Sequence, residues 1–181
     1  MHLLASMLDA EAAALFRLAY RLTGNRHDAE DLVQDACERA LSKAPSLQTP
    51  GDCRRWLLRV LYNLYIDGAR RRTRSPLVAA TNDEVDRGGP AGSVPDPEAL
   101  AAQAESESAL ERAWEKLDSA QQILLLLRAE GRSLTEISGI TEVAKPALSV
   151  RLNRARSKLA KLIDEERDDA RALRVAAGRK T

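Results

Sequence analysis

Apolar side chains recur every three or four residues along most of the chain, and this spacing most strongly limits its possible fold. Leu15, Leu18 and Leu22 share one such stripe, and Leu148 and Leu152 belong to another. A spacing of three or four places these side chains on one face of an α-helix. Aromatic residues make up only 3% of the chain, so strand-forming residues are scarce. We therefore expect an all-α protein.

Residues 75–98 interrupt this pattern. The stretch contains clustered glycine and proline, including Gly88, Gly89 and Pro90, and almost no large apolar side chains. Such a segment cannot bury enough apolar surface to pack. The sequence therefore predicts two small helical domains joined by a flexible linker. The expected parts are a first domain at 1–74, the linker at 75–98, a second domain at 99–163 and a charged tail at 164–181, either a frayed helix or disordered.

Charge is distributed unevenly, although the formal net charge is only +1. An arginine-rich stretch spans residues 54–74, a second basic stretch spans 145–161, and an acidic stretch spans 28–38. Two basic patches in a nearly neutral chain indicate two local contacts with a polyanion, and they leave the acidic surface for a different partner. Solvated helix faces would give the same charge runs, so charge alone does not decide between these interpretations.

The chain offers little for catalysis, metal binding or membrane insertion. His2 and His27 are the only histidines, Cys37 and Cys53 lack the spacing of a zinc site, and no phosphate-binding glycine loop is present. We therefore expect no enzyme activity, metal or cofactor, and two reduced thiols. No apolar run approaches the ~20 residues needed to cross a bilayer, and the first residues lack a basic signal-peptide start. The sequence predicts a cytoplasmic protein.

The second predicted domain ends in a helix-turn-helix pattern. Ser133 and Glu136 form a capping box that begins a short helix over about 134–140. Pro146 favours the start of a longer helix that runs to about residue 162. In a helix-turn-helix, the start of the second helix enters the major groove of DNA. A helical hairpin that never meets DNA would give the same pattern, so the signal is not decisive by itself.

The helix expected over 52–72 combines aromatic and basic side chains. Trp56, Tyr62 and Tyr65 lie among many arginines. Aromatic rings can stack on unpaired bases while arginines hold the backbone beside them. This combination suits single-stranded or melting DNA. For Trp56 itself, a role as an anchor in the core is the favoured alternative.

Three segments stand in an order that is typical of one protein family. They are DAEDLVQD at 28–35, WLLRV at 56–60 and RLNRARSKL at 151–159. Together with the helical pattern between them, they resemble regions 2 and 4 of the extracytoplasmic-function (ECF) sigma factors, proteins that direct bacterial RNA polymerase to promoters. The similarity covers most of residues 10–163.

The resemblance implies that the acidic helix binds core RNA polymerase at the clamp helices of the β′ subunit, with the β flap as a further polymerase contact. By position, the core-polymerase-binding residues would be Asp28, Asp31, Leu32, Gln34 and Asp35. An anti-sigma factor is a further partner that the resemblance implies.

The resemblance also implies two contacts with promoter DNA. Residues 42–52 and the helix that follows would capture and melt the −10 element, and the second helix of the helix-turn-helix would read the −35 element. The −10 candidates are Arg54, Arg55, Trp56, Arg59, Asn63, Arg70 and Arg71. The −35 candidates are Lys145, Ala147, Ser149, Val150, Arg151, Asn153, Arg154 and Arg156.

The helix-turn-helix departs from the family pattern in its turn. Where the family has a glycine, this chain has Glu142, which would be strained unless Gly139 moved the turn upstream. Pro146 and Ala147 replace the usual Gly-Thr pair. A sigma-like mimic that sequesters an anti-sigma factor without binding DNA therefore stays open as an alternative. An unrelated helix-turn-helix regulator would leave residues 10–72 unexplained.

Overall fold

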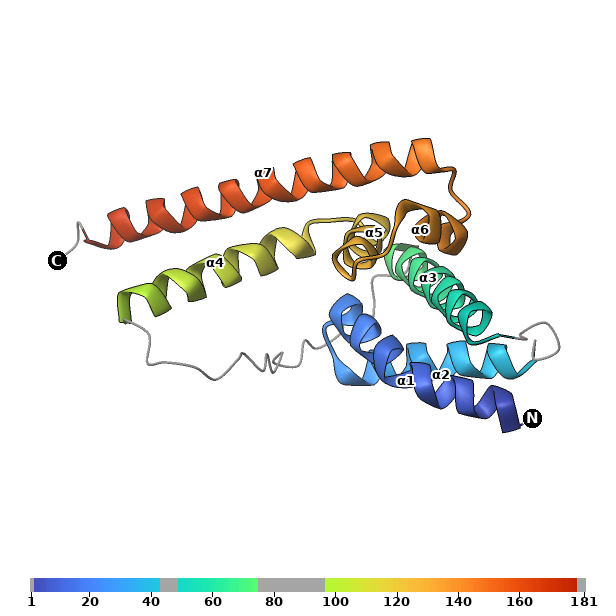
Figure 1. The fold of residues 1–181 in the computed structure, drawn as a ribbon. Coiled ribbons are helices and arrows are strands. Elements are labelled where there is room, and N and C mark those ends of the chain that lie inside the picture. Colours follow the sequence, from blue (N-terminus) through green and yellow to red (C-terminus); the bar gives the residue numbers. More distant parts are fainter. Residues whose placement is uncertain (1, 43–48, 75–96, 179–181) are drawn as a thin grey trace. The chain divides into compact units, whose positions relative to one another are not determined.

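The computed structural model describes residues 2–42, 49–74 and 97–178. Within these ranges the chain is helical apart from short turns, which confirms the expected all-α class. The helices are α1 (His2–Thr23), α2 (Arg26–Ser42), α3 (Pro50–Arg74), α4 (Pro97–Glu115), α5 (Ser119–Ala129), α6 (Leu134–Thr141) and α7 (Lys145–Gly178) (Figure 1). Most of the predicted linker, residues 75–96, lies outside the described residues, as do residues 43–48.

The chain forms two compact units. Unit 1 comprises Met1–Asp86 and Leu126–Ser149, and unit 2 comprises Arg87–Leu125 and Val150–Thr181. Unit 1 therefore holds α1, α2, α3, α6 and the adjoining ends of α5 and α7. Unit 2 holds α4 and the remainder of α5 and α7.

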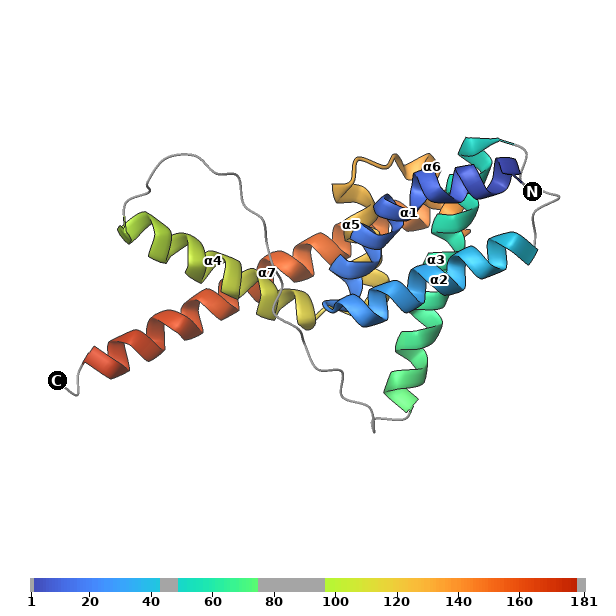
Figure 2. The same cartoon turned by 90° about the horizontal axis from the view of Figure 1, so that it is seen from below.

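The core of unit 1 lies between its first three helices. Figure 2 shows α1 and α2 side by side, with α3 crossing them, and each of the three packs on the other two. Leu15, Leu18, Leu57 and Leu61 are buried, and their spacing along each helix is three or four residues. Burial of one such leucine stabilises a fold by about 1.5–3 kcal/mol, so this stripe holds α3 in place.

The turn between α1 and α2 depends on a glycine and an asparagine cap. Gly24 has a φ of +74°, which a glycine adopts without steric cost. The Asn25 side chain accepts the backbone N–H of Asp28 at 2.7 Å and donates to the Asp28 carboxylate at 2.8 Å. The Tyr65 hydroxyl of α3 donates to the Leu22 carbonyl at 3.2 Å. These bonds fix the start of the acidic helix α2 against α3.

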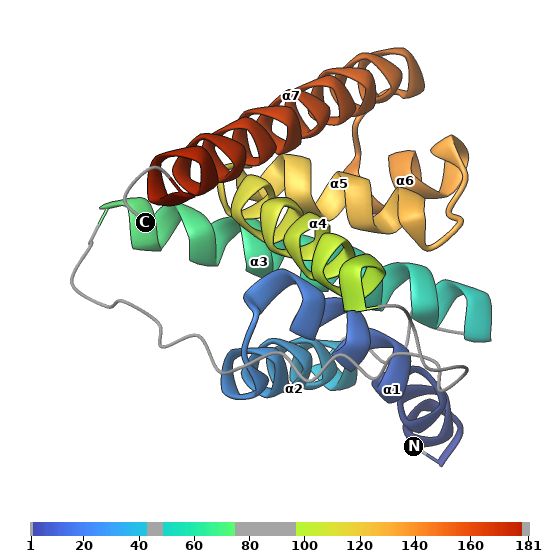
Figure 3. The same cartoon turned by 90° about the vertical axis from the view of Figure 1, so that its left-hand side faces the viewer.

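The short helix α6 packs on α3 within unit 1. Figure 3 shows α6 beside the half of α3 that comes first in the chain, drawn in teal. Ile137 and Ile140 are buried. A side-chain carbon placed on Gly139 would lie 3.6 Å from Cδ of Arg55, so the backbone of α6 comes close to the arginine side chains of α3.

Unit 2 contains most of the long helix α7, which extends into the tail at 164–181. The sequence pattern allows this tail to be either a frayed helix or disordered. Residues 164–178 continue α7 as helix. The Glu166 carboxylate, whose side chain is only 8% exposed, accepts a hydrogen bond from Arg112 of α4 at 2.5 Å and pairs with Lys116. These two cations hold the pKa of Glu166 below its usual range. The paired carboxylate joins the extension of α7 to α4. The partners are 54 and 50 positions apart, so no local sequence pattern predicts this contact.

Candidate nucleic-acid interface

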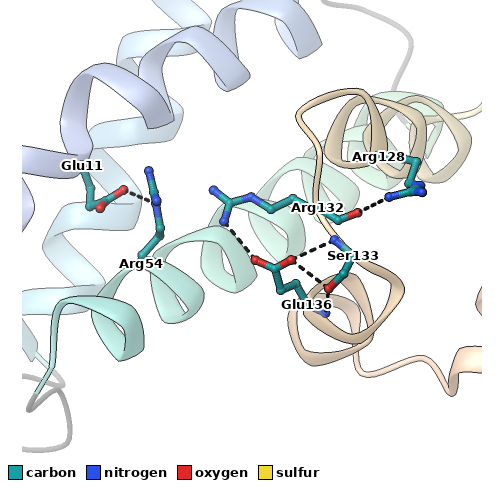
Figure 4. Close-up of polar contacts among 6 residues, drawn as sticks. All are labelled: Glu11, Arg54, Arg128, Arg132, Ser133 and Glu136. Carbon is teal, nitrogen blue, oxygen red and sulfur yellow. Dashed lines mark hydrogen bonds and ion pairs between the residues drawn. The ribbon is translucent and has the colours of Figure 1, made fainter.

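Two arginines at the start of α3 lie next to carboxylates. Nε of Arg54 donates to the Glu11 carboxylate of α1 at 2.7 Å (Figure 4). Arg55 donates to the Asp52 carboxylate at 2.8 Å, one helical turn earlier. Neither arginine is therefore a free cation in unit 1. No local sequence pattern indicates the first pair, because 43 residues separate its members.

A third arginine of α3 is paired with the turn after α6. Arg59 forms an ion pair with Glu142. Glu142 has a φ of +58°, and its N–H donates to the Ser138 carbonyl at 2.9 Å. The left-handed position in the turn is thus held by a glutamate, and Gly139 stays inside the helix. For a residue other than glycine, this conformation costs about 1–2 kcal/mol.

The remaining −10 candidates of α3 are more accessible. Asn63 and Arg71 are exposed, and Arg70 lies 3.6 Å from the Asp67 carboxylate in an exposed ion pair. Trp56 is half-buried, so it is neither a fully enclosed core anchor nor a fully free ring. The free polar side chains of this helix therefore lie toward its second half.

The short helix α6 begins with the predicted capping box. The Ser133 hydroxyl accepts the Glu136 N–H at 3.2 Å, and the Glu136 carboxylate accepts the Ser133 N–H at 2.8 Å. Arg132 adds a more distant ion pair at 3.4 Å (Figure 4). Bonds from the Ser133 backbone and hydroxyl lower the pKa of Glu136, with a smaller contribution from Arg132. The cap fixes where α6 begins and hence where its turn falls.

The first half of α7 separates apolar and polar side chains. Leu148, Leu152 and Ala155 are buried, and Ser149 is half-buried. The other −35 candidates are exposed: Lys145, Ala147, Val150, Arg151, Asn153, Arg154 and Arg156. The four cations in that set form no ion pair with any described residue. Val150, which is 49% exposed, adds an apolar contact surface among them.

The start of α7 adds a second attraction for anions. Its first backbone N–H groups have no partner in the preceding turn of helix, as at any helix N-terminus. The helix dipole also favours negative charge there. Together with the unpaired cations, this arrangement suits a phosphate backbone with base edges between its phosphates.

The acidic helix α2 presents a polar face. Asp31, Gln34 and Asp35 are exposed, and Gln34 donates to Glu38 at 3.0 Å. The structure brings these candidates together on consecutive turns of one helix. Two others differ: Leu32 is half-buried, and the Asp28 carboxylate is half-buried and bonded to the Asn25 cap. At its end, Leu41 is 56% exposed.

The described residues contain few other features of a chemical site. Burial is the main cause of the raised pKa of Cys37 and of Cys53, with smaller contributions from Asp9 and Glu11 respectively. Both thiols are therefore less reactive than an exposed cysteine. Within the described ranges, no group of three or more candidate ligands could hold a metal ion. No described helix is long and apolar enough to span a bilayer.

Comparisons with known proteins place this geometry in context. The profile of sigma-70 region 2 matches residues 7–75. The chain is 32% identical to the ECF RNA polymerase sigma factor EcfG of Rhodopseudomonas palustris over 155 residues, which cover 85% of this chain and 81% of that protein. It is 36% identical to the ECF RNA polymerase sigma factor SigE of Mycolicibacterium smegmatis over 154 residues, 84% of this chain. The match spans 58% of SigE, so the chain covers little more than half of that relative.

A solved structure has a similar fold. The sigma factor RpoE of Bartonella quintana, in complex with the anti-sigma factor NepR, superposes with a TM-score of 0.64 and 25% sequence identity. The alignment covers 88% of this chain and 96% of that one. The similarity therefore extends over both the N-terminal helices and the helix-turn-helix.

Proposed function

The chain belongs to the family of ECF RNA polymerase sigma factors, and from this premise we propose that it binds core polymerase and directs promoter recognition, melting and transcription initiation. The observation that carries the proposal is the division of charged surfaces among three helices. An exposed acidic face lies on α2, whereas basic side chains lie on α3 and α7. A protein with these surfaces can bind a basic protein partner and DNA at separate places.

We assign polymerase binding to the exposed face of α2. Asp31, Gln34 and Asp35 would meet the clamp helices of β′, and the exposed Leu41 would add apolar contact at the end of the helix. Leu32, which is half-buried, would contribute only its exposed part. Asp28 would act through its bond to the Asn25 cap, which orients the first turn of α2. The β flap would be a further polymerase contact.

Capture of the −10 element is assigned to α3. Asn63 is exposed and can bond to the edge of an unpaired base, while Arg70 and Arg71 can hold phosphates. Energy from trapping flipped bases would offset the cost of unstacking them. Arg54, Arg55, Trp56 and Arg59 would contribute after their internal contacts rearrange. The rest of the proposed capture segment, residues 43–48, lies outside the described residues.

The −35 element would be read by the first half of α7. Arg151 can bond to guanine, Asn153 can bond to base edges, and Val150 can contact a thymine methyl group. Arg154 and Arg156 would hold phosphates, and so would Lys145 at the start of the helix. Ser149 adds a half-buried hydroxyl. Ala147 has no hydroxyl, so α7 would make one polar contact with DNA fewer than it would with a threonine at this position.

Regulation by an anti-sigma factor in the cytoplasm is also proposed. The solved structure of similar fold is a sigma factor in complex with an anti-sigma factor. A sigma-like mimic that binds an anti-sigma factor but not DNA is the second candidate. The observation that favours it is the neutralisation of Arg54, Arg55 and Arg59 by carboxylates. Both candidates are binding proteins without catalytic chemistry.

Binding of fluorescently labelled chain to purified core polymerase tests the proposal and separates the two candidates. Reversing one charge by Asp35→Lys should weaken binding by about tenfold or more, because like charges would then face each other. Glu115→Lys makes the same kind of charge reversal at an exposed position of α4, a helix to which no polymerase contact is assigned, and should leave binding unchanged. A chain that failed to bind core polymerase, yet bound an anti-sigma factor, would favour the mimic.

A further inference from the structure

The glutamate in the turn after α6 is an unusual choice for its backbone conformation. Glu142 adopts a φ of +58°, a region that favours glycine. Its side chain is 69% exposed, so packing in the core does not account for a glutamate at this position. The contact that distinguishes this side chain is its ion pair with Arg59 of α3. The strained residue therefore has a partner on the helix to which −10 binding is assigned.

The Arg59 guanidinium is bonded through an Nη atom, whereas its Nε has no partner among the described residues. One Nη atom bonds to the Glu142 carboxylate. Nε of the same guanidinium is shielded from solvent and has no hydrogen-bond partner among the described residues. A buried donor without a partner is unfavourable. The contact between α6 and α3 thus contains two unfavourable features, a strained turn and an unsatisfied Nε, which keep it from being strongly stabilised.

Two further contacts within unit 1 join arginines of α1 and α3 to residues 126–149. Arg21 of α1 lies 3.3 Å from the Glu130 carboxylate just after α5. Near α6, the backbone at Gly139 lies against the side chain of Arg55. Arginines of α1 and α3 thus meet carboxylates or backbone of residues 126–149, and all of these residues belong to unit 1.

We propose that α6 and its turn form an intramolecular latch on α3, in which the Glu142 carboxylate occupies Arg59 in place of a DNA phosphate. This inference rests on the proposed function, since it concerns the availability of a −10 contact. In the latched state Arg59 is neutralised and α6 lies beside the start of α3. Promoter DNA must displace Glu142 before Arg59 can bind a phosphate, because one guanidinium edge cannot serve both partners in the same geometry.

The size of the effect follows from the exposure of the pair. Side-chain exposures are 37% for Arg59 and 69% for Glu142, so water and salt screen the attraction. A partly exposed pair of this kind shifts an equilibrium by up to about fivefold. The latch therefore tunes the population of chains that are ready to bind DNA, and it is weak enough for DNA or a protein partner to open.

Two substitutions at one position test the latch. Glu142→Gly removes the carboxylate and relieves the left-handed strain, whereas Glu142→Gln removes the charge and keeps a side chain of similar size. Both should raise the affinity for a single-stranded −10 oligonucleotide by up to about fivefold at low salt, and the gain should shrink at high salt. Glu115→Gln, an exposed change in unit 2, should leave the affinity unchanged.

A second measurement reports on the contact without DNA. The rate at which the Arg59 Nε–H proton exchanges with water, followed by NMR, should rise in both Glu142 variants because the guanidinium is released. Unchanged exchange together with unchanged affinity would overturn the latch and leave the proposed function standing. Faster exchange without a gain in affinity would overturn its role in DNA binding. If no variant bound the oligonucleotide, the proposed function would fail, and the exchange rate would still decide whether Glu142 holds Arg59.

Discussion

Two basic helices, α3 and α7, differ in how their cations are used within the protein. The arginines in the first half of α3 are paired with carboxylates of α1, of α3 itself and of the turn after α6. Four exposed cations in the first half of α7 form no ion pair with any described residue; they are Lys145, Arg151, Arg154 and Arg156. Both helices bury an apolar stripe, so the difference lies in the outward faces alone.

This difference changes what each helix must do to bind DNA. A phosphate that meets Arg154 or Arg156 replaces water and salt ions only. A phosphate that meets Arg54 or Arg59 must also displace a carboxylate, which then needs new solvation. A count of arginines in the sequence treats the two helices as equivalent, whereas under the proposed function DNA would meet unpaired cations on α7 and paired arginines on the first half of α3.

The largest expected effect tests whether α3 packs into the hydrophobic core of unit 1 in addition to carrying the proposed DNA contacts. Leu61→Ala removes a fully buried side chain and should lower the free energy of unfolding by about 2–5 kcal/mol. Asn63→Ala, an exposed change on the same helix, should change it by less than about 0.5 kcal/mol. Urea denaturation followed by circular dichroism measures both. Equal effects would mean that α3 does not pack as described.

The next effect tests the comparison of free and paired cations. Arg154→Ala with Arg156→Ala should lower the slope of log affinity against log salt concentration by about 1.8 for a promoter duplex, since each lost phosphate contact removes about 0.9. Arg54→Ala with Arg55→Ala should lower the slope by less, because the carboxylates freed on binding attract cations again. Fluorescence anisotropy over a salt series gives these slopes. Equal changes of slope for the two double variants would contradict the distinction between unpaired cations on α7 and paired arginines on α3.

A smaller effect concerns α6, the short helix that precedes α7 in the chain. Ser133→Ala removes the cap of α6 and should cost about 1 kcal/mol of unfolding free energy. Ser133→Asp keeps an acceptor at the cap and should recover part of that loss. Thermal unfolding compares the three proteins. A Ser133→Ala variant as stable as the parent would show that the cap contributes nothing to unit 1.

The smallest effect concerns the extension of α7 and depends on pH. Lys116 and, to a smaller extent, Arg112 lower the pKa of Glu166 in the folded state, so the stabilisation is present above the unfolded pKa of about 4.3. It is lost as the pH falls through the depressed folded value. Glu166→Gln should therefore lower Tm at pH 7 and have a diminishing effect toward pH 3. A difference in Tm that did not change over this range would contradict the ion-pair origin of the contact.

The sequence predicted local features of the fold well. Helical periodicity, the capping box at Ser133 and the strained turn at Glu142 all depend on residues within a few positions of one another. Such features follow from backbone geometry and short-range hydrogen bonds. The division of the polar and apolar faces of α7 could be predicted for the same reason.

Contacts between distant residues could not be predicted in this way. Nothing near Arg54 indicates Glu11, and nothing near Glu142 indicates Arg59, because the packing of separate helices brings each pair together. The helical tail is a similar case, since Glu166 meets Arg112 across 54 positions. The candidate site was therefore predicted as a set of residues, whereas the ion pairing of each guanidinium required the structure.

Run-off transcription with purified core polymerase tests the proposed initiation function most directly. Core polymerase with this chain should give a transcript of defined length from a native promoter template, and the Arg154→Ala, Arg156→Ala variant should give much less. Glu115→Gln should give as much as the parent chain. Absence of a promoter-dependent transcript on every native template, with a chain that is folded, would contradict the assignment of promoter recognition and melting to this protein.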